Sequence, residues 1–320
     1  MPRVLLTDNI AIEALEVFDR YEGIEGVRVD TLPPDQLEEA IAECDGVVVR
    51  SPTKLTAGVI AAAVKLRYIG RAGVGVDNID VGAATERGIV VMNSPGGNTV
   101  STAEHTIALM LALVRRVPQA HISVTSGDWD RKAFRGNELS GKTLGVVGLG
   151  RVGREVAIRM RAFGMRVLGA DPVVDDAAAA EAGAERVELD ALLCESDLVT
   201  VHVPLSDATR GIIGEEEIGR MKDGAFLINC ARGGVVSEDA LVSALESDKL
   251  AGAAVDVFET EPPGDHPLFR HPRCVFTPHL GAATVEAQVR VAVEAAENVA
   301  RALLTGETRN AVNAAAGGKA

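Results

Sequence analysis

The chain has 320 residues, a length that predicts about two domains, and 47% of its residues are hydrophobic, which is enough for sizeable cores. Its formal net charge of −14 disfavours binding to nucleic acid or to an anionic membrane surface. No apolar run approaches the ~18 residues of a membrane span. The chain opens on a strand pattern, so no signal peptide is expected.

The first part of the chain alternates short apolar runs with helical patterns. The runs that predict strands cover residues 3–7, 27–29, 46–49, 66–70 and 89–92. Such alternation is typical of an α/β fold in which a parallel sheet has helices on both faces. Ligands of these sheets bind beyond the carboxyl ends of the strands. Two of the ends carry arginines, Arg50 and Arg71, which could hold an anionic substrate.

A long helix is predicted from Ser101 to about Arg116, with Pro118 just past its end, and it serves as the first crossing between domains. A second series of strands then ends at Gly148, Asp171, Pro204, Cys230, Asp256 and His279. A helical pattern over 284–304 is long enough to cross back. We therefore predict a discontinuous substrate-binding domain of 1–97 and 283–320 around a nucleotide-binding domain of 98–282, with a frayed tail at 314–320.

A glycine-rich turn follows the apolar run 143–147 and leads into a helical pattern. The turn has the form GxGxxG, with Gly148, Gly150 and Gly153. Glycines there let the backbone approach a pyrophosphate, whose charge then lies at the helix N-terminus. The next strand ends at Asp171, at the distance where an acid bonds the ribose hydroxyls of NAD. Together these features predict a dinucleotide site.

The cysteines and histidines show no spacing typical of a metal site. The cysteines, Cys44, Cys194, Cys230 and Cys274, are predicted to be reduced thiols of a cytoplasmic protein. Of the six histidines, only His279, at the end of the last predicted strand, is a candidate for proton transfer. The others, His105 and His202 among them, are assigned structural roles.

Two further stretches carry charged candidates. Arg232 precedes two glycines at a strand end, so its guanidinium could take a carboxylate bidentately, or it could be a surface arginine in a turn. Glu259 and Glu261 precede two prolines, and both could be solvated loop acids. A carboxylate near His279 would hold the imidazole in orientation. The residues alone leave these alternatives open.

The sequence resembles the D-isomer-specific 2-hydroxyacid dehydrogenase family from end to end. The matching stretches are VVVRSPTKLT at 47–56, GRAGVGVDNID at 70–80, GLGRVG at 148–153, NCARGGVV at 229–236, DVFETEPP at 256–263 and TPHLGAAT at 277–284. The resemblance implies two doubly wound parallel-sheet domains, a Rossmann NAD domain inserted into a flavodoxin-like substrate domain. The chain stops soon after Asn313, where longer relatives continue into serine-binding regulatory domains, so it is either a short natural form or a truncated one.

The resemblance also implies the site residues. The catalytic set is Arg232, Glu261 and His279. The contacts to NAD are Val74, Gly148, Gly150, Arg151, Val152, Gly153, Asp171, Val203, Pro204, Cys230, Ala231, Arg232, Asp256, His279, Gly281 and Ala282. The substrate contacts are Arg50, Ser51, Arg71, Gly73, Val74 and Asn98, joined by Arg131, Lys132 and Arg135 from a neighbouring subunit. Val203 departs from the threonine that many relatives carry there.

The implied activity is NAD-dependent oxidation of 3-phospho-D-glycerate to 3-phosphohydroxypyruvate, the first step of serine biosynthesis. A glyoxylate or hydroxypyruvate reductase of the same family would share the three catalytic residues but need no phosphate clamp. Outside the enzymes, an NAD-sensing transcriptional corepressor is the alternative, and such a protein would carry long disordered tails. The expected assembly is a homodimer or homotetramer.

Overall fold

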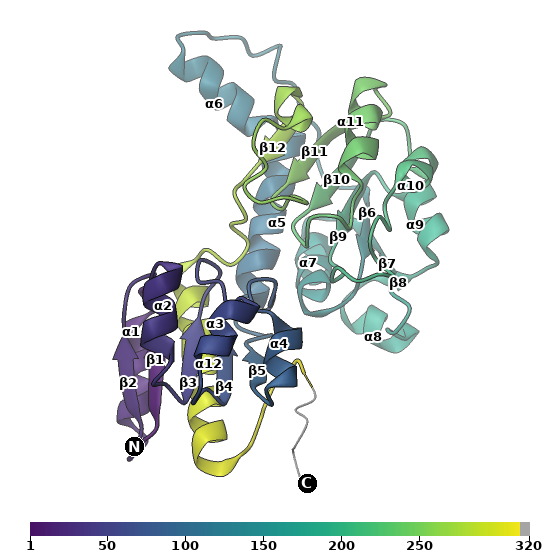
Figure 1. The fold of residues 1–320 in the computed structure, drawn as a ribbon. Coiled ribbons are helices and arrows are strands. Elements are labelled where there is room, and N and C mark those ends of the chain that lie inside the picture. The colour runs from purple at the N-terminus through teal and green to yellow at the C-terminus, as the bar shows by residue number, and fades with distance from the viewer. Residues whose placement is uncertain (314–320) are drawn as a thin grey trace. The chain divides into compact units, whose positions relative to one another are not determined.

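The computed structural model describes residues 1–313, and the predicted frayed tail lies outside these described residues. Contacts divide the chain into two compact units (Figure 1). Unit 1 comprises Met1–Asn98 and Ala282–Ala320, and unit 2 comprises Thr99–Gly281. Because unit 2 is one continuous segment, the chain enters it once and leaves it once. The boundaries predicted from the sequence lay between 97 and 98 and between 282 and 283.

Unit 1 is a parallel sheet covered by helices. Its elements within the described residues are β1 (Arg3–Leu6), α1 (Ile12–Asp19), β2 (Glu25–Arg28), α2 (Pro34–Ile41), β3 (Gly46–Val49), α3 (Ala57–Ala62), β4 (Tyr68–Arg71), α4 (Val81–Glu86), β5 (Val90–Asn93) and α12 (Val285–Thr305). The strand order is β2-β1-β3-β4-β5, and each neighbouring pair is parallel. This is the flavodoxin-like order, which confirms the predicted fold of this part.

The two faces of this sheet pack against different helices. On β1, Val4 and Leu6 belong to the core formed with α1 and α12, whereas Leu5 belongs to the core formed with α2 and α3. Glycines on β3 and β4 let α12 approach: a Cβ on Gly70 would lie 3.0 Å from the carbonyl oxygen of Ala295. The C-terminal helix is thus built into unit 1.

Unit 2 contains the longer sheet. Its elements are α5 (Thr99–Val114), α6 (Val117–Thr125), β6 (Thr143–Val147), α7 (Arg151–Ala162), β7 (Arg166–Ala170), α8 (Asp176–Glu181), β8 (Glu185–Arg186), α9 (Leu189–Glu195), β9 (Leu198–Val201), α10 (Glu215–Arg220), β10 (Ala225–Asn229), α11 (Glu238–Glu246), β11 (Leu250–Val255), the 3₁₀ helix η1 (Pro267–Arg270) and β12 (Cys274–Phe276). The order is β12-β11-β10-β9-β6-β7-β8, all parallel. The chain reverses direction across the sheet between β6 and β9, as in a Rossmann fold, so the predicted class is confirmed.

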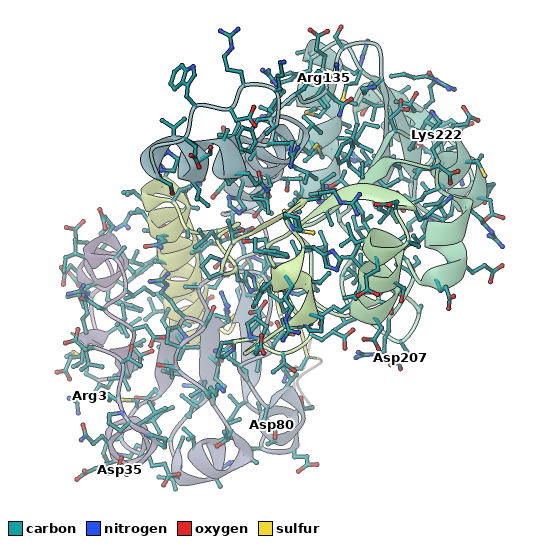
Figure 2. All side chains as sticks on the ribbon, turned by 90° about the horizontal axis from the view of Figure 1, so that it is seen from above. Arg3, Asp35, Asp80, Arg135, Asp207 and Lys222 are labelled. Carbon is teal, nitrogen blue, oxygen red and sulfur yellow. The ribbon has the colours of Figure 1, made fainter. Side chains whose placement is uncertain are left out.

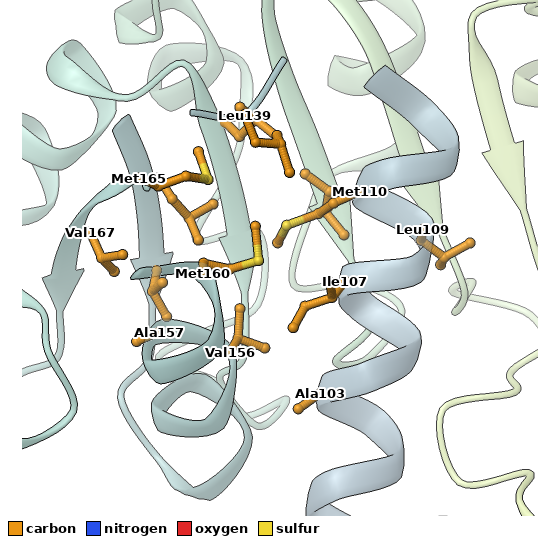
Figure 3. Packing of buried hydrophobic residues seen from close by; sticks show 14 of the residues in the cluster. Ala103, Ile107, Leu109, Met110, Leu139, Val156, Ala157, Met160, Met165 and Val167 are labelled. Carbon is orange, nitrogen blue, oxygen red and sulfur yellow. The ribbon is translucent and has the colours of Figure 1, made fainter. Parts of the chain in front are cut away.

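Helices α5 and α7 cover one face of this sheet. Ile107 and Met110 of α5 pack toward Val156 and Met160 of α7 in one apolar core (Figure 3). The other face is covered by α9, α10 and α11, whose buried residues form a separate core with the sheet. Because both faces are covered, the central strands are almost wholly buried, which explains their continuous apolar sequence.

One helix was not predicted, and one strand end was wrong. Helix α5 ends at Val114, so Pro118 lies past its end as predicted, but Pro118 also lies in the first turn of a second helix, α6. Proline is tolerated there because its missing N–H would have no partner at a helix start. The strand predicted to end at Pro204 is β9, which ends at Val201, so His202 follows this strand instead of lying within it.

No single helix among the described residues is long and apolar enough to cross a membrane. Helices α5 and α6 pass that test only when joined as a pair bent by 63°.

Candidate active site

The glycine turn lies at the point where the strand order of unit 2 reverses. Gly148 follows β6 with φ +93°, a conformation that side chains rarely adopt. A Cβ on Gly153 would lie 2.0 Å from the carbonyl oxygen of Gly148, so only glycine allows α7 to start this close to β6. Gly150 is the N-cap of α7 and brings no capping side chain. The first turn of α7 contains Arg151 and Val152, two of the predicted NAD contacts. Its backbone N–H groups are suited to binding an anion.

Asp171 stands directly after β7. Its Oδ2 accepts a hydrogen bond from Leu149 N at 2.8 Å, and its Oδ1 accepts from Val173 N at 2.9 Å and Val174 N at 3.2 Å. These bonds fix the carboxylate beside the glycine turn. A carboxylate has about four acceptor sites, so capacity remains for a ribose hydroxyl. The turn, the helix start and this acid together fit a bound dinucleotide.

Other predicted cofactor contacts surround the same strand ends. Val203 lies against the turn, since a Cβ on Gly148 would be 2.9 Å from its Cγ1. Pro204 follows it and accepts a hydrogen bond from Thr209 through its carbonyl. Cys230 is buried at the end of β10, and burial raises the pKa of its thiol to about 12, so it stays protonated. Ala282 is the first residue of the return to unit 1.

His279 and Glu261 form a hydrogen-bonded pair in unit 2. The His279 Nδ1 lies 2.8 Å from Glu261 Oε2, and both side chains are partly exposed. Glu261 Oε1 accepts a hydrogen bond from Phe258 N at 3.1 Å. Because the carboxylate only accepts, Nδ1 carries the proton and Nε2 is left as an acceptor. The two residues thus form the arrangement expected of a general base and its orienting acid.

The electrostatics of Glu261 agree with this pairing. Burial raises its pKa, but the hydrogen bonds from His279 and from Phe258 N outweigh burial, and the net pKa lies below the ordinary value. The carboxylate therefore remains ionised at neutral pH and favours a positive charge on the ring beside it. Its contribution to stability is present above its ordinary pKa and is lost as the pH falls through the lowered one.

Asp256 anchors the loop that carries His279. Its Oδ1 accepts from Leu280 N at 2.7 Å and from Thr277 Oγ1 at 2.5 Å, and its Oδ2 accepts from Gly281 N at 3.0 Å. The side chain is 1% exposed. Burial raises its pKa, yet these bonds and one to His105 hold the net pKa below the ordinary value. Asp256 was predicted as a cofactor contact; in the structure its oxygens bind the His279 loop.

Helix α5 supplies further contacts to this loop that the sequence did not reveal. His105 Nε2 lies 3.2 Å from Asp256 Oδ1 and 3.0 Å from Thr277 Oγ1. Ser101 Oγ donates to the carbonyl oxygen of Gly281 at 2.7 Å. The i, i+4 spacing of Ser101 and His105 places both on one helix face, but nothing in the sequence indicated what that face touches.

Arg232 lies in the turn after β10, and Asn229 shapes that turn. Asn229 Nδ2 donates to the Arg232 carbonyl oxygen at 3.0 Å, and its Oδ1 accepts from Ala231 N at 3.0 Å. The Arg232 Nη1 donates to the Ala231 carbonyl oxygen at 2.7 Å. A Cβ on Gly233 would lie 2.0 Å from the Phe258 carbonyl oxygen. Glycine is therefore required where the Arg232 turn meets the segment leading to Glu261.

Unit 1 gathers its predicted substrate residues at the carboxyl ends of β3 and β4. Arg71 Nη2 donates to Ser51 Oγ at 2.6 Å. Gly73 has φ +141°, and a Cβ there would meet Arg71 Nη1 at 1.8 Å. The backbone N–H of Arg50 donates to Asp8 Oδ2 at 2.8 Å. Asp8, which the sequence analysis did not single out, is thus the residue that fixes the start of the Arg50 loop.

The remaining predicted contacts of unit 1 lie nearby along the chain. The Val74 carbonyl oxygen accepts from Asn93 Nδ2 at 2.7 Å, which ties the end of β5 to the segment after β4. Asn98 stands in the turn just ahead of α5. These contacts define an edge of unit 1 with two cationic side chains, Arg50 and Arg71.

The predicted phosphate-binding residues of unit 2 lie elsewhere in that unit. Arg131, Lys132 and Arg135 are exposed on the segment between α6 and β6. Figure 2 shows Arg135 and Lys222 along one edge of unit 2, and Asp207, which follows the carboxyl end of β9, along the opposite edge.

Arg135 also lines a hollow of about 150 Å³, and the other residues of this hollow show at which edge of the sheet Arg135 lies. Phe226, Ala251 and Arg273 also line this hollow, and they stand at or just before the amino ends of β10, β11 and β12. The glycine turn, Arg232 and His279 follow carboxyl ends of strands in the same sheet. Arg135 therefore does not reach the site of its own unit 2.

Replacing Glu261 with Gln should shift the pH dependence of turnover. The carboxylate favours the protonated ring of His279, so its loss should move the pH limb controlled by the ring to lower pH. The measurement is kcat/KM against pH, with Glu259→Gln, an exposed neighbour in the same loop, as the matched control. An unchanged limb in Glu261→Gln would contradict the pairing.

Comparison with known proteins places these features in a family. Residues 107–281 match the model of the D-isomer specific 2-hydroxyacid dehydrogenase, NAD binding domain. The D-3-phosphoglycerate dehydrogenase of Archaeoglobus fulgidus is 50% identical over 313 residues, 97% of this chain and 59% of the relative. This chain thus spans less than two thirds of the length of that curated relative.

Solved structures give the same result. Protein TT0316 of Thermus thermophilus is 38% identical, with a TM-score of 0.86 over 97% of this chain and 100% of that one. A glyoxylate reductase from Paecilomyes thermophila is 32% identical, with a TM-score of 0.86 over 97% of this chain and 98% of that one. These likenesses extend over both units.

Proposed function

Because the chain belongs to the D-isomer-specific 2-hydroxyacid dehydrogenase family, we propose that it oxidises 3-phospho-D-glycerate to 3-phosphohydroxypyruvate with NAD. The observation that carries this proposal is the 50% identity to a D-3-phosphoglycerate dehydrogenase over 97% of the chain. The candidate site supports it, since the base, its acid and the clamp arginine are carried by one unit.

The residues of unit 2 divide the work of the reaction. NAD, when bound, supplies the acceptor for the hydride of substrate C2. His279 Nε2 takes the proton of the C2 hydroxyl, since Nδ1 is engaged by Glu261. Glu261 stabilises the positive ring that results. Arg232 binds the substrate carboxylate and draws electron density from the C2 oxygen.

Asp171 supports a preference for NAD over NADP. A carboxylate at this position accepts ribose hydroxyls and repels a 2′-phosphate. Asp171→Ala should therefore relax the preference rather than abolish turnover, although Leu149 N, Val173 N and Val174 N lose their acceptor. The measurement is kcat/KM with each cofactor, alongside thermal unfolding to record the lost backbone bonds. Comparable efficiency of the unaltered chain with both cofactors would refute the assignment.

The substrate carries a carboxylate at one end and a phosphate at the other, so two cationic sites are needed. For the phosphate we propose Arg50 in unit 1, joined by Arg131, Lys132 and Arg135 of a second copy. The second copy is needed because Arg135 lies at the amino ends of the strands of its own unit 2. A homodimer or homotetramer is therefore proposed, and light scattering at micromolar concentration should give at least twice the mass of one chain.

The test of the substrate compares three 2-keto acids in the NADH-consuming direction. Phosphohydroxypyruvate should be reduced with higher kcat/KM than hydroxypyruvate or glyoxylate. Arg131→Ala and Arg135→Ala should raise KM for phosphohydroxypyruvate and leave KM for glyoxylate nearly unchanged, because only the former carries a phosphate.

Equal efficiency with the unphosphorylated acids would replace this proposal with a second candidate, a glyoxylate or hydroxypyruvate reductase. The likeness to the Paecilomyes glyoxylate reductase favours that candidate. We further propose a cytoplasmic location, since all four cysteines are unpaired, and cell fractionation tests it.

A further inference from the structure

A second histidine–glutamate pair, His266 and Glu238, contacts the loop that carries Glu261. Glu238 is the first residue of α11, and its side chain and that of His266 are each 16% exposed. Glu238 Oε2 lies 2.9 Å from His266 Nε2. Its Oε1 accepts a hydrogen bond from the backbone N–H of Glu259 at 2.7 Å. The Glu238 carboxylate thus links the start of α11 to His266 and to the loop that carries Glu261.

The contacts of His266 determine its tautomer. The backbone N–H of Leu268 donates to His266 Nδ1 at 3.3 Å, so Nδ1 is an acceptor. The proton of the neutral ring is therefore on Nε2, and it is donated to Glu238. The ring is held in place by aromatic neighbours, with centroids 5.8 Å from Phe258 and 5.8 Å from Phe269.

The backbone that Glu238 holds is the backbone that orients Glu261. Glu259, whose N–H Glu238 binds, directly follows Phe258, whose N–H donates to Glu261 Oε1. The other oxygen of Glu261 contacts His279. Hydrogen bonds and the backbone of one residue, Phe258, therefore link Glu238 to Glu261 and through it to the general base.

The same peptide is confined from its other side. A Cβ on Gly233 would lie 2.0 Å from the carbonyl oxygen of Phe258 and 2.5 Å from Glu259 N. The Phe258–Glu259 peptide thus lies between the Arg232 turn and the Glu238 carboxylate. Loss of the carboxylate would remove the side-chain acceptor of the Glu259 N–H and permit the peptide to rotate.

We propose that Glu238 is a positioning residue for the reaction: with His266 it fixes the Phe258–Glu259 peptide and so aims Glu261 at His279. This inference rests on the roles proposed above for Glu261 and His279. The side chain of Glu238 bonds to the loop backbone and to His266, so it acts through Glu261 rather than on the reacting atoms.

The test is a double-mutant cycle of Glu238→Gln and Glu261→Gln in the full chain. Glutamine keeps the volume of Glu238 but presents an NH₂ group to one of its two donors. Glu238→Gln alone should lower kcat about tenfold and move the pH limb in the same direction as Glu261→Gln, because both weaken the support of His279. In the Glu261→Gln background it should cost less than about twofold, since the residue it positions is gone. The Kd for NADH should be unchanged.

The assay uses whichever 2-keto acid the chain reduces fastest, so the result does not depend on the identity of the substrate. Asp239→Asn is the matched control: it removes an exposed carboxylate from the same first turn of α11 and should leave kcat unaltered. His266→Gln, which retains an N–H donor, should keep more activity than His266→Ala.

Two results would overturn the inference. An equal loss in both backgrounds would show that Glu238 acts on the fold in general, and an unchanged kcat in the single variant would show no role. The failure of the proposed function looks different, because there Glu261→Gln itself would leave kcat and the pH limb unaltered.

Discussion

Replacing His279 with alanine is expected to lower kcat for oxidation of 3-phospho-D-glycerate by about 10²–10⁴, the usual loss when a general base is removed. The Nε2 of His279 is the acceptor that the Glu261 bond leaves available. Without it the hydroxyl proton must pass to water as the hydride leaves. The Kd for NADH should change far less than kcat, because the glycine turn and Asp171 are unaltered.

The control for this variant is His121→Ala, which removes an exposed histidine of α6. It should retain full activity. If His279→Ala turned over at the normal rate, or if both variants lost activity equally, His279 would not be the base.

Replacing Arg232 with alanine is expected to cost roughly 3–4 kcal/mol of transition-state stabilisation, if it resembles the loss of an oxyanion donor. The turn that carries Arg232 is fixed by Asn229 and by the close approach of Gly233 to Phe258. The backbone position from which the Arg232 side chain extends is therefore fixed. The loss should appear in kcat as well as KM, because the C2 oxygen becomes more negative as its proton leaves. Arg232→Lys should recover only part of it, since an ammonium lacks the planar fork.

The measurement is the steady-state kcat and KM of Arg232→Ala. The control is Arg270→Ala, which removes a surface arginine with 74% of its side chain exposed. That control should behave as the unaltered chain. A rise in KM alone for Arg232→Ala would mean that the arginine binds the substrate but does not stabilise the transition state.

The fold and the dinucleotide turn could be predicted because their signals are local. Apolar runs of strand length, the GxGxxG turn between β6 and α7, and the acid after β7 follow one another within a short segment. The second helix after Arg116 was missed because Pro118 ends one helix as readily as it starts another.

The partners of the candidate site could not be predicted, because they depend on segments far apart in the chain. The residue pattern by itself left Glu259 and Glu261 as equivalent acids of one loop, and only the family resemblance favoured Glu261; the structure separates them through the bond to His279. His105 was assigned a structural role, and its ring lies against Asp256, 151 residues further on. Only the packing of α5 against the end of the sheet brings these groups together.

The proposed oxidation is tested most directly by NADH formation from 3-phospho-D-glycerate and NAD, with the unaltered chain and His279→Ala assayed in parallel. We expect NADH and 3-phosphohydroxypyruvate to form in equal amounts with the unaltered chain. The rate should fall by at least about a hundredfold in the variant. No NADH from 3-phospho-D-glycerate, together with rapid reduction of glyoxylate by the same preparation, would contradict the proposed substrate.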